Sequence, residues 1–413
     1  MTSEPQQVFV WVWLPEATEP VVAGRLDPVG PPVNFTYGRS YLEREDAIPL
    51  FLPELPLEPN QISPRVGEMP GCIADAGPDA WGQRVILNRL TGRADADTAE
   101  LGPLTYLIES GSDRIGALDF QTSATEYVPR AMEHATMDEL AESAERVEKG
   151  IPLSPELDQA LLHGSSVGGA RPKALLDDGG RKLIAKFSST TDTYPVVKGE
   201  FLAMELARRV GLEVPPVSLA VAHGRDALLV ERFDRPGAGH RRAMVSALTL
   251  LGLDEAGARY GSYADLADQV RARFTEAKPT LHELFSRIVF NILCSNTDDH
   301  PRNHAAFWDG EALALTPAYD ICPQLRSGGE AAQLMAIGRD GWRMSQVAGC
   351  VDRAGTYQLS EMEAREIVDH QLETIEGQWD EVCGLAELGE ADRAAFRGRQ
   401  FLNAYALEGY ERG

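Results

Sequence analysis

The chain has 413 residues, more than one hydrophobic core usually serves, so two or three domains are expected. Its 39 basic and 63 acidic residues give a net charge of −24, which argues against direct coating of DNA or RNA. Apolar runs are too short for a membrane span, the first residues lack the blocks of a signal peptide, and the cysteines lack zinc-knuckle spacing. We therefore expect a cytoplasmic protein with no membrane contact.

The first 125 residues are predicted to form a β-rich domain. "VFVWVWL" (8–14) is rich in β-branched and aromatic residues, which predicts a strand. "EPVVAGRL" (19–26) is expected to form a second strand that pairs with it in a hairpin. Apolar residues at helical spacing predict a helix over 77–90. A further strand is predicted over 112–120, before "TSATEYVPRA" interrupts the pattern.

Residues 126–242 are predicted to form a second, mixed domain. A polar helix is followed by "KALLDDGGRKLIAKF" (173–187), in which paired glycines between two strand-like runs indicate a hairpin. A helix should end at Gly211, because prolines follow it. "VSLAVA" and "DALLVERF" are then predicted as strands.

Residues 243–413 are predicted to be mostly helical. "TLHELFSRIVFNILCSN" has a broad apolar stripe, and Thr280 with Glu283 would form a capping box at its start. A second long helix is predicted to begin with the same pairing at Ser360 and Glu363.

"NTDDHPRNHAAF" (296–307) concentrates carboxylates, histidines and asparagines at the end of that apolar helix. A metal site, an acid/base site and an ordinary polar turn are three interpretations of it. Pro301 lies between His300 and His304, which disfavours the shared helix face that zinc sites use, and the HExxH pattern is absent. A helix end followed by a polar turn needs no chemistry at all.

Other segments favour the acid/base interpretation. Phosphoryl transfer needs a carboxylate that accepts a proton, oxygen ligands for Mg²⁺, a cation on the phosphates and a glycine-rich loop. "SSVGGARPK" (165–173) is a glycine-rich turn with a cation, and Lys186 follows on a strand. Asp298 and Asn303 have the Asp-x4-Asn spacing of a kinase catalytic loop, and Asp320 follows a short strand. This is the chain order of a protein kinase.

The sequence resembles the HipA family, the serine/threonine-kinase toxins of bacterial type II toxin–antitoxin pairs. The resemblance is carried by "GPDAWGQRVI", "RIGALDF", "SSVGGARPKALL", "AKF", "VERFDR", "NTDDHPRNHAAF" and "LTPAYDICP". It implies an α+β fold with a β-rich N-terminal subdomain (1–125) and a two-lobed kinase-like body. The N-lobe with its phosphate loop would span 126–242, and the helical C-lobe with the catalytic loop would span 243–413.

The resemblance also implies ATP and Mg²⁺ as cofactors. Asp298 would be the catalytic base, and Asn303 and Asp320 would bind the metal and the nucleotide. Lys186 would contact the α- and β-phosphates, and Ser166 would be autophosphorylated, with Ser165 as the adjacent alternative. The other nucleotide-binding residues implied are Gly168, Gly169, Ala170, Arg171, Pro172, Lys173, Glu231, Arg232, Phe233, His300 and Tyr319.

The leading hypothesis is a toxin kinase that phosphorylates itself and a cellular protein, as some relatives phosphorylate aminoacyl-tRNA synthetases. Its implied partner is a HipB-type DNA-binding antitoxin, so DNA contact would be indirect. A catalytically weak corepressor and a small-molecule kinase are the alternatives. The chain departs from many relatives at Arg171-Pro172, where proline should stiffen the loop. It also departs at Asp299, an extra carboxylate that would be either solvated or an added source of metal affinity.

Overall fold

The computed structural model describes residues 5–28, 32–92, 97–130, 135–151, 153–154, 157, 171–326 and 329–413. The chain divides into two compact units. Unit 1 comprises Met1–Thr191, Ala220–Val245 and Phe307–Glu311, and unit 2 comprises Asp192–Leu219, Ser246–Ala306 and Ala312–Gly413. The finer division at 1–125, 126–242 and 243–413 stays a prediction.

Unit 1 contains a four-stranded sheet near the N-terminus, in the order β3-β2-β1-β4. Its strands are β1 (Val8–Val12), β2 (Val21–Pro28), β3 (Val33–Tyr37) and β4 (Leu118–Gln121). The predicted hairpin is confirmed, since β1 and β2 pair antiparallel. The strand expected over 112–120 is shorter, because regular extended backbone starts only after Gly116, whose φ is +77°.

The second sheet of unit 1 has the order β5-β6-β8-β7. Its strands are β5 (Lys173–Asp178), β6 (Arg181–Phe187), β7 (Val217–Ala222) and β8 (Arg225–Glu231). The predicted β5–β6 hairpin is confirmed, and its turn glycines, Gly179 and Gly180, have φ values of +61° and +94°. Side chains without a glycine's freedom rarely adopt this conformation.

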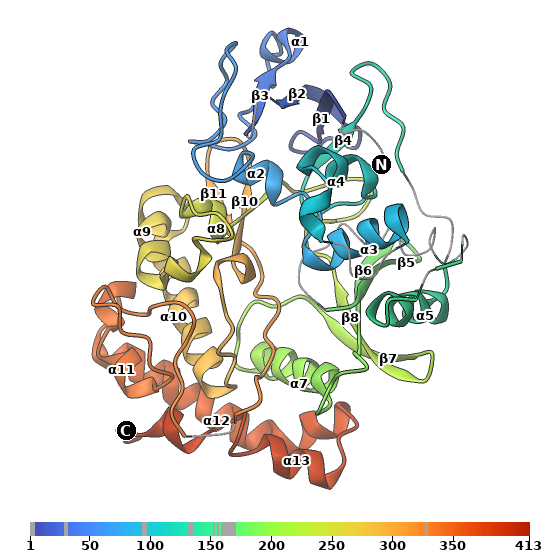
Figure 1. Ribbon diagram of the computed structural model, residues 1–413. Coiled ribbons are helices and arrows are strands. Elements are labelled where there is room, and N and C mark those ends of the chain that lie inside the picture. Colours follow the sequence, from blue (N-terminus) through green and yellow to red (C-terminus); the bar gives the residue numbers. More distant parts are fainter. Residues whose placement is uncertain are drawn as a thin grey trace. The chain divides into compact units, whose positions relative to one another are not determined.

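Helices α3 (Ala80–Thr91) and α5 (Met137–Glu148) pack on this second sheet (Figure 1). Trp81 from α3 and Leu140 from α5 share a buried core with Ala174, Ala185 and Phe187 of the strands. A helix from the N-terminal part of the chain thus completes the core of the sheet that follows it in sequence. The remaining short helices of the unit are α1 (Arg39–Leu42), α2 (Gly71–Ala74), η1 (Thr98–Glu100) and α4 (Pro103–Glu109).

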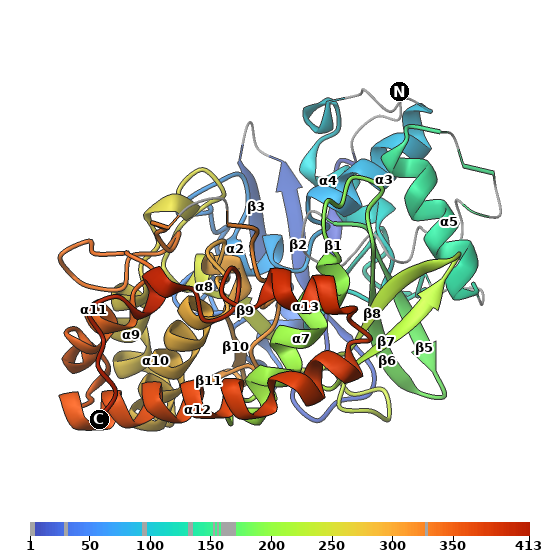
Figure 2. The same cartoon turned by 90° about the horizontal axis from the view of Figure 1, so that it is seen from below.

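Unit 2 is built around α10 (Ala277–Leu293), whose apolar residues are almost all buried. Helices α9 (Tyr263–Arg273) and α12 (Glu361–Leu385) pack against it, and α7 (Val196–Arg209) lies along α12 (Figures 1 and 2). The other helical segments are α8 (Ala247–Leu250), η3 (Ala258–Tyr260), η4 (Pro301–Asn303), α11 (Val347–Val351), η5 (Ala354–Tyr357), α13 (Glu390–Phe396) and η6 (Ala404–Leu407).

The two predicted capping boxes have different outcomes. Ser360 caps α12 and forms the box with Glu363, as predicted. The box at Thr280 and Glu283 is wrong, because α10 begins at Ala277 and Thr280 lies inside it. Pro279 is accommodated in the first turn, where a backbone N–H has no helical partner to lose. Glu283 instead accepts a hydrogen bond of 2.8 Å from Nε of Arg287.

The C-terminal part is mostly helical, as expected, but it contributes to three short strands. They are β9 (Met244–Ser246), β10 (Ala305–Trp308) and β11 (Leu313–Leu315), in the order β11-β10-β9. The boundary between the units falls inside β9 and β10. None of the helices in the described parts of the chain is both long enough and apolar enough to cross a membrane.

Candidate active site

The polar segment that follows α10 forms a tight loop in unit 2. Ser295 has a φ of +53°, and the Asn296 amide turns back to donate to the carbonyl of Asn291 at 2.8 Å. Asp298 is then exposed, whereas the next residue, Asp299, is only 2% exposed. Pro301 opens the 3₁₀ turn η4 rather than continuing a helix, which agrees with the expectation from its sequence. The loop therefore presents one carboxylate outward and turns its neighbour inward.

The Asp298 carboxyl has a pKa above its ordinary value. Partial burial of the carboxyl is the largest cause, and the carboxylates of Asp320 and Asp299 add to it, while His300 opposes it. Like charges close together disfavour ionisation. The predicted base and the predicted metal ligand Asp320 are thus close enough to interact electrostatically within unit 2.

Asp320 lies on a segment that is attached to the loop at several points. Its φ is +60°, an uncommon backbone conformation for a non-glycine residue that occurs frequently at functional sites. The hydroxyl of Tyr319 donates to the carbonyl of Arg302 at 2.7 Å, which joins this segment to η4. The amide of Gln324 donates to the carbonyl of Ser295 at 3.0 Å. Asp298, Asn303 and Asp320 therefore come from two mutually bonded segments.

Asp299 accepts three hydrogen bonds through one oxygen, Oδ2. The donors are the hydroxyl of Tyr263, Nδ2 of Asn291 at 2.9 Å and Nε2 of His304 at 2.7 Å. The expectation that this extra carboxylate is solvated is wrong, because Asp299 is buried. The alternative that it adds metal affinity stays a prediction. Among the described residues no cluster of three His, Cys, Asp or Glu side chains could hold a metal ion. His300 and His304 make separate contacts, His300 through Nδ1 with the amide of Arg302.

In unit 1 the two predicted phosphate lysines lie directly opposite each other on β5 and β6. Lys186 is half-buried, whereas Lys173 is 2% exposed. The Lys173 ammonium pairs with the carboxylate of Asp79 at 3.4 Å, and the indole N–H of Trp81 donates to the Lys173 carbonyl at 3.2 Å. The start of α3 therefore holds the start of β5.

Glu231 is the last residue of β8, and Arg232 and Phe233 follow it. Glu231 and Phe233 are half-buried, but the guanidinium of Arg232 is buried and ion-paired with Asp113 at 2.9 Å and Asp234 at 2.8 Å. These contacts fix the backbone of the segment from inside unit 1. The Arg232 side chain is thereby held by carboxylates of its own unit.

The predicted phosphate loop lies largely outside the described residues. Ser166, its neighbour Ser165, and Gly168, Gly169 and Ala170 all fall there. Of the described part, Arg171 is half-buried and Pro172 is buried beside Lys173.

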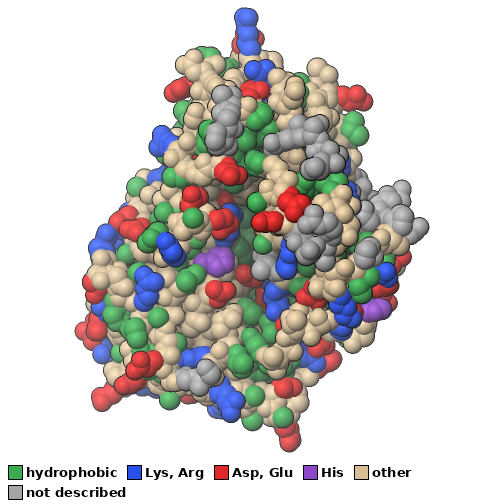
Figure 3. All heavy atoms as spheres, viewed as in Figure 1, with side chains coloured by type: hydrophobic (Ala, Val, Ile, Leu, Met, Phe, Trp, Pro, Cys, Tyr) green, Lys and Arg blue, Asp and Glu red, His purple; other side chains and the backbone are tan. Residues whose placement is uncertain are grey.

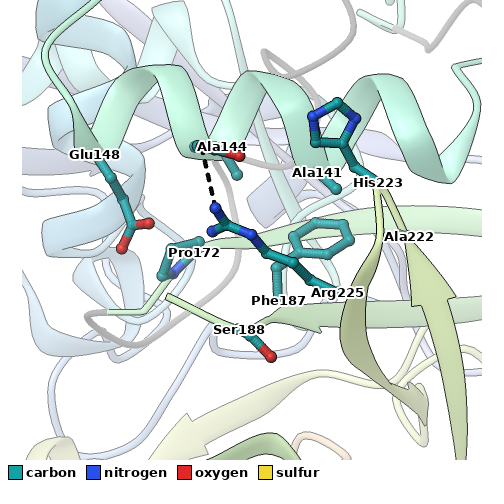
Figure 4. Close-up of a pocket in the computed structure, with 10 residues that line it drawn as sticks. Ala141, Ala144, Glu148, Pro172, Phe187, Ser188, Ala222, His223 and Arg225 are labelled. Carbon is teal, nitrogen blue, oxygen red and sulfur yellow. Dashed lines mark ion pairs between the residues drawn. The ribbon is translucent and has the colours of Figure 1, made fainter. Parts of the chain in front are cut away.

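Pro172 lines a small hollow between α5 and the sheet (Figure 4). Arg225 reaches across this hollow to Glu145 at 3.0 Å. The cavity of about 10 Å³ holds about one water molecule, so it is too small for a nucleotide.

The partners of Lys173 and Asp299 are not evident from sequence patterns. Asp79 was visible only as part of a helix start. Asn291 is a single amide within a continuous apolar helix, and that isolated polar position was a signal that it bonds to something buried. Tyr263 carried no local signal, because it is 36 residues from Asp299.

Two family models match the chain. The HipA-like C-terminal domain matches residues 165–379, and the HipA N-terminal domain matches residues 12–121. The chain belongs to the HipA family. The first match contains the site of unit 2 together with Lys173 and Lys186, whereas Asp79 lies within the second.

Two individual relatives that match the chain are named as kinases. Y4mE of Sinorhizobium fredii, which is named as a kinase, is 26% identical over 75% of this chain and 79% of its own length. The serine/threonine-protein kinase toxin HipA of Shewanella oneidensis is 27% identical, over 38% of this chain and 42% of its own length.

The solved complex of HipA, HipB and operator DNA from Shewanella oneidensis MR-1 matches with a TM-score of 0.67 and 20% identity. It covers 91% of this chain and 92% of that one. The α+β, kinase-like HipA fold is thereby confirmed, and the chain is a kinase-like protein.

Proposed function

We propose that this HipA-family chain is an ATP- and Mg²⁺-dependent protein serine/threonine kinase that acts as the toxin of a toxin–antitoxin pair. One observation carries the proposal. Unit 2 presents Asp298 to solvent from a rigidly bonded loop, close to Asp320, with Asn303 on the same loop. Phosphoryl transfer depends mainly on positioning and charge stabilisation, and this arrangement supports both.

The donor set fits Mg²⁺. A carboxylate at Asp320 and an amide oxygen at Asn303 are the hard oxygen ligands that this ion prefers. When bound, Mg²⁺ would neutralise charge on the nucleotide phosphates. Lys186, opposite Lys173 on the sheet of unit 1, would supply a cation for those phosphates.

Asp298 would act on the acceptor hydroxyl. As the phosphoryl group passes to the acceptor oxygen, that oxygen releases its proton to the Asp298 carboxylate, and ADP leaves. An exposed carboxylate can reach a hydroxyl on another protein, whereas the buried carboxylate of Asp299 cannot.

The test is phosphate transfer from labelled ATP by wild-type and Asp298→Asn proteins, with phosphopeptide mapping of cells that express each. The amide cannot accept the proton, so activity should fall by about 10²–10⁴-fold. Asp352→Asn makes the same change at an exposed position of unit 2 and serves as the control. Equal activity of the Asp298→Asn protein would refute the assigned base. Phosphate found only on small molecules would instead favour a small-molecule kinase.

Asp320→Ala separates metal binding from proton transfer. Loss of this carboxylate should weaken ATP binding in the presence of Mg²⁺, measured by calorimetry, and should affect binding much less when Mg²⁺ is chelated. Unchanged Mg²⁺–ATP affinity would place the metal ligand elsewhere.

A HipB-type antitoxin is the proposed partner, because the structurally similar Shewanella protein forms a complex with HipB and operator DNA. On the face seen in Figure 3, acidic and basic side chains are interspersed, and the described side chains there form no broad basic field. That surface suits DNA contact through a partner. A chain that binds the antitoxin but transfers no phosphate would favour the corepressor alternative.

A further inference from the structure

We infer that Asp299 is a positioning residue, whose buried hydrogen bonds hold the catalytic loop so that Asp298 points outward. This inference rests on the proposed kinase function, because it assigns Asp299 a role in that reaction. The two carboxylates are neighbours in sequence but have opposite surroundings, since Asp298 is exposed and Asp299 is buried. Anchoring Asp299 restrains the backbone that carries Asp298.

The three donors to Asp299 come from separate elements of unit 2. Tyr263 opens α9, Asn291 lies in the last turns of α10, and His304 directly precedes β10. All three converge on one carboxylate oxygen. The loop is thus tied to two core helices and to the strand that follows it, rather than to a single neighbour.

All three partners of Asp299 can donate a hydrogen bond. A carboxylate oxygen that accepts needs a hydrogen from each of them. Burial and the nearby carboxylate hold the pKa of Tyr263 well above its ordinary value, so its hydroxyl stays protonated. His304 must carry its proton on Nε2, and its Nδ1 atom has no hydrogen-bond partner among the described residues.

A second layer of hydrogen bonds supports the first. Nδ2 of Asn296 donates to Oδ1 of Asn291 at 3.0 Å, which orients the Asn291 amide so that its own Nδ2 points at Asp299. The carbonyl of His304 accepts from the amide of Ala247 at 2.7 Å. The Asn291 side chain is therefore oriented toward Asp299, and the backbone of His304 is held in place. Such preorganisation is what a catalytic loop requires.

The test compares Asp299→Asn and Tyr263→Phe with Tyr357→Phe. Tyr357 is a buried tyrosine of the same unit whose hydroxyl donates to the carbonyl of Ile337 at 2.8 Å. Its substitution removes a similar buried hydrogen bond, so it controls for lost stability. Two measurements are made on the full-length proteins: kcat and KM for Mg²⁺–ATP, and hydrogen exchange of peptides that cover 295–305.

We expect Asp299→Asn to lower kcat by about 10²-fold, the effect of a small misplacement of a catalytic group, with a much smaller change in KM. Tyr263→Phe should lower kcat less, and both variants should exchange faster over 295–305. Tyr357→Phe should leave kcat and that exchange unchanged.

If the wild type is active and Asp299→Asn leaves kcat unchanged, the inference is overturned and the proposed function stands. An inactive wild type with faster exchange in the two loop variants would refute the proposed function and retain the anchoring role. Unchanged exchange over 295–305 in both loop variants would overturn the anchoring itself.

Discussion

Asp119 in unit 1 and Asp299 in unit 2 are both buried carboxylates, but the two units satisfy them with different partners. Asp119 accepts from the guanidinium groups of Arg114 and Arg130, both at 2.9 Å, and from Gln121 and Tyr127. Among the described residues, the donors to Asp299 are a tyrosine, an asparagine and a histidine. Asp119 thus neutralises two arginines, one of them fully buried, whereas Asp299 orients a loop.

The two carboxylates differ in the partner groups that would remain unpaired if the carboxylate were removed. Arg114 is fully buried, so without Asp119 it would be an uncompensated charge inside unit 1. Such a charge costs far more than a lost hydrogen bond, because the interior solvates it poorly. Loss of Asp299 leaves polar but mostly neutral groups, which cost less. The Asp119 network therefore acts mainly on the stability of unit 1, by balancing the charge of Arg114. The Asp299 network acts mainly on the site of unit 2, by orienting its loop.

The largest effect is expected from Asp119→Asn. It leaves Arg114 buried without its counter-charge, so unit 1 should lose about 3–5 kcal/mol of unfolding free energy. Urea unfolding followed by hydrogen exchange resolves the two units separately. Asp178→Asn, which breaks an exposed pair with Arg181 in the same unit, is the control and should change little. A small effect of Asp119→Asn would remove the distinction between the two networks.

A smaller loss, about 2 kcal/mol and confined to unit 2, is expected from Asp299→Asn. Hydrogen bonds to a charged group contribute more than neutral ones, but no buried cation is left without a partner. The same exchange experiment measures it. A loss as large as that of Asp119→Asn would show that the Asp299 network contributes as much to stability as the Asp119 network, and would remove the distinction between them.

Acid should weaken unit 1 gradually. Burial alone would raise the pKa of Asp119, but Arg114 and Arg130 outweigh it and hold that pKa below its ordinary value. A carboxyl whose pKa is lower in the folded state binds protons more readily when unfolded. Its contribution is therefore complete above about pH 4, the ordinary range of aspartate, and is lost as the pH falls through the folded pKa. Stability measured from pH 5 to 2 should decline less steeply in Asp119→Asn than in the wild type.

Local sequence patterns predicted those features that depend on neighbouring residues. The Ser360 capping box and the glycine turn between β5 and β6 are of this kind, and both are confirmed. The box at Thr280 failed because a proline that commonly precedes helices lies inside the first turn of α10. Short-range sequence patterns therefore indicated the helices and strands, but not the residue at which each of them begins.

The candidate site was only partly predictable for the same reason. Asp298, Asn303 and Asp320 were found through spacing and resemblance, and their assigned roles stay predictions. The network of Asp299 could not be found, because Tyr263 and Asn291 reach it from 36 and 8 residues away. Contacts between residues so far apart in sequence depend on how the helices pack, and the hydrophobic periodicity of the sequence does not reveal them.

The smallest effect is expected from Arg130→Met, which removes the more exposed cation of the Asp119 network. The Arg130 side chain is 26% exposed, and solvent screens its pairing, so the loss should be about 1 kcal/mol or less. Methionine keeps the apolar stem, and the backbone bonds between Arg130 and Ser112 remain. Asp119 would still be paired with Arg114.

The double variant Asp119→Asn/Arg130→Met should therefore be more stable than the sum of the two losses implies, because both changes act on one carboxylate. Strict additivity in urea unfolding of unit 1 would mean that Arg130 does not share the Asp119 charge.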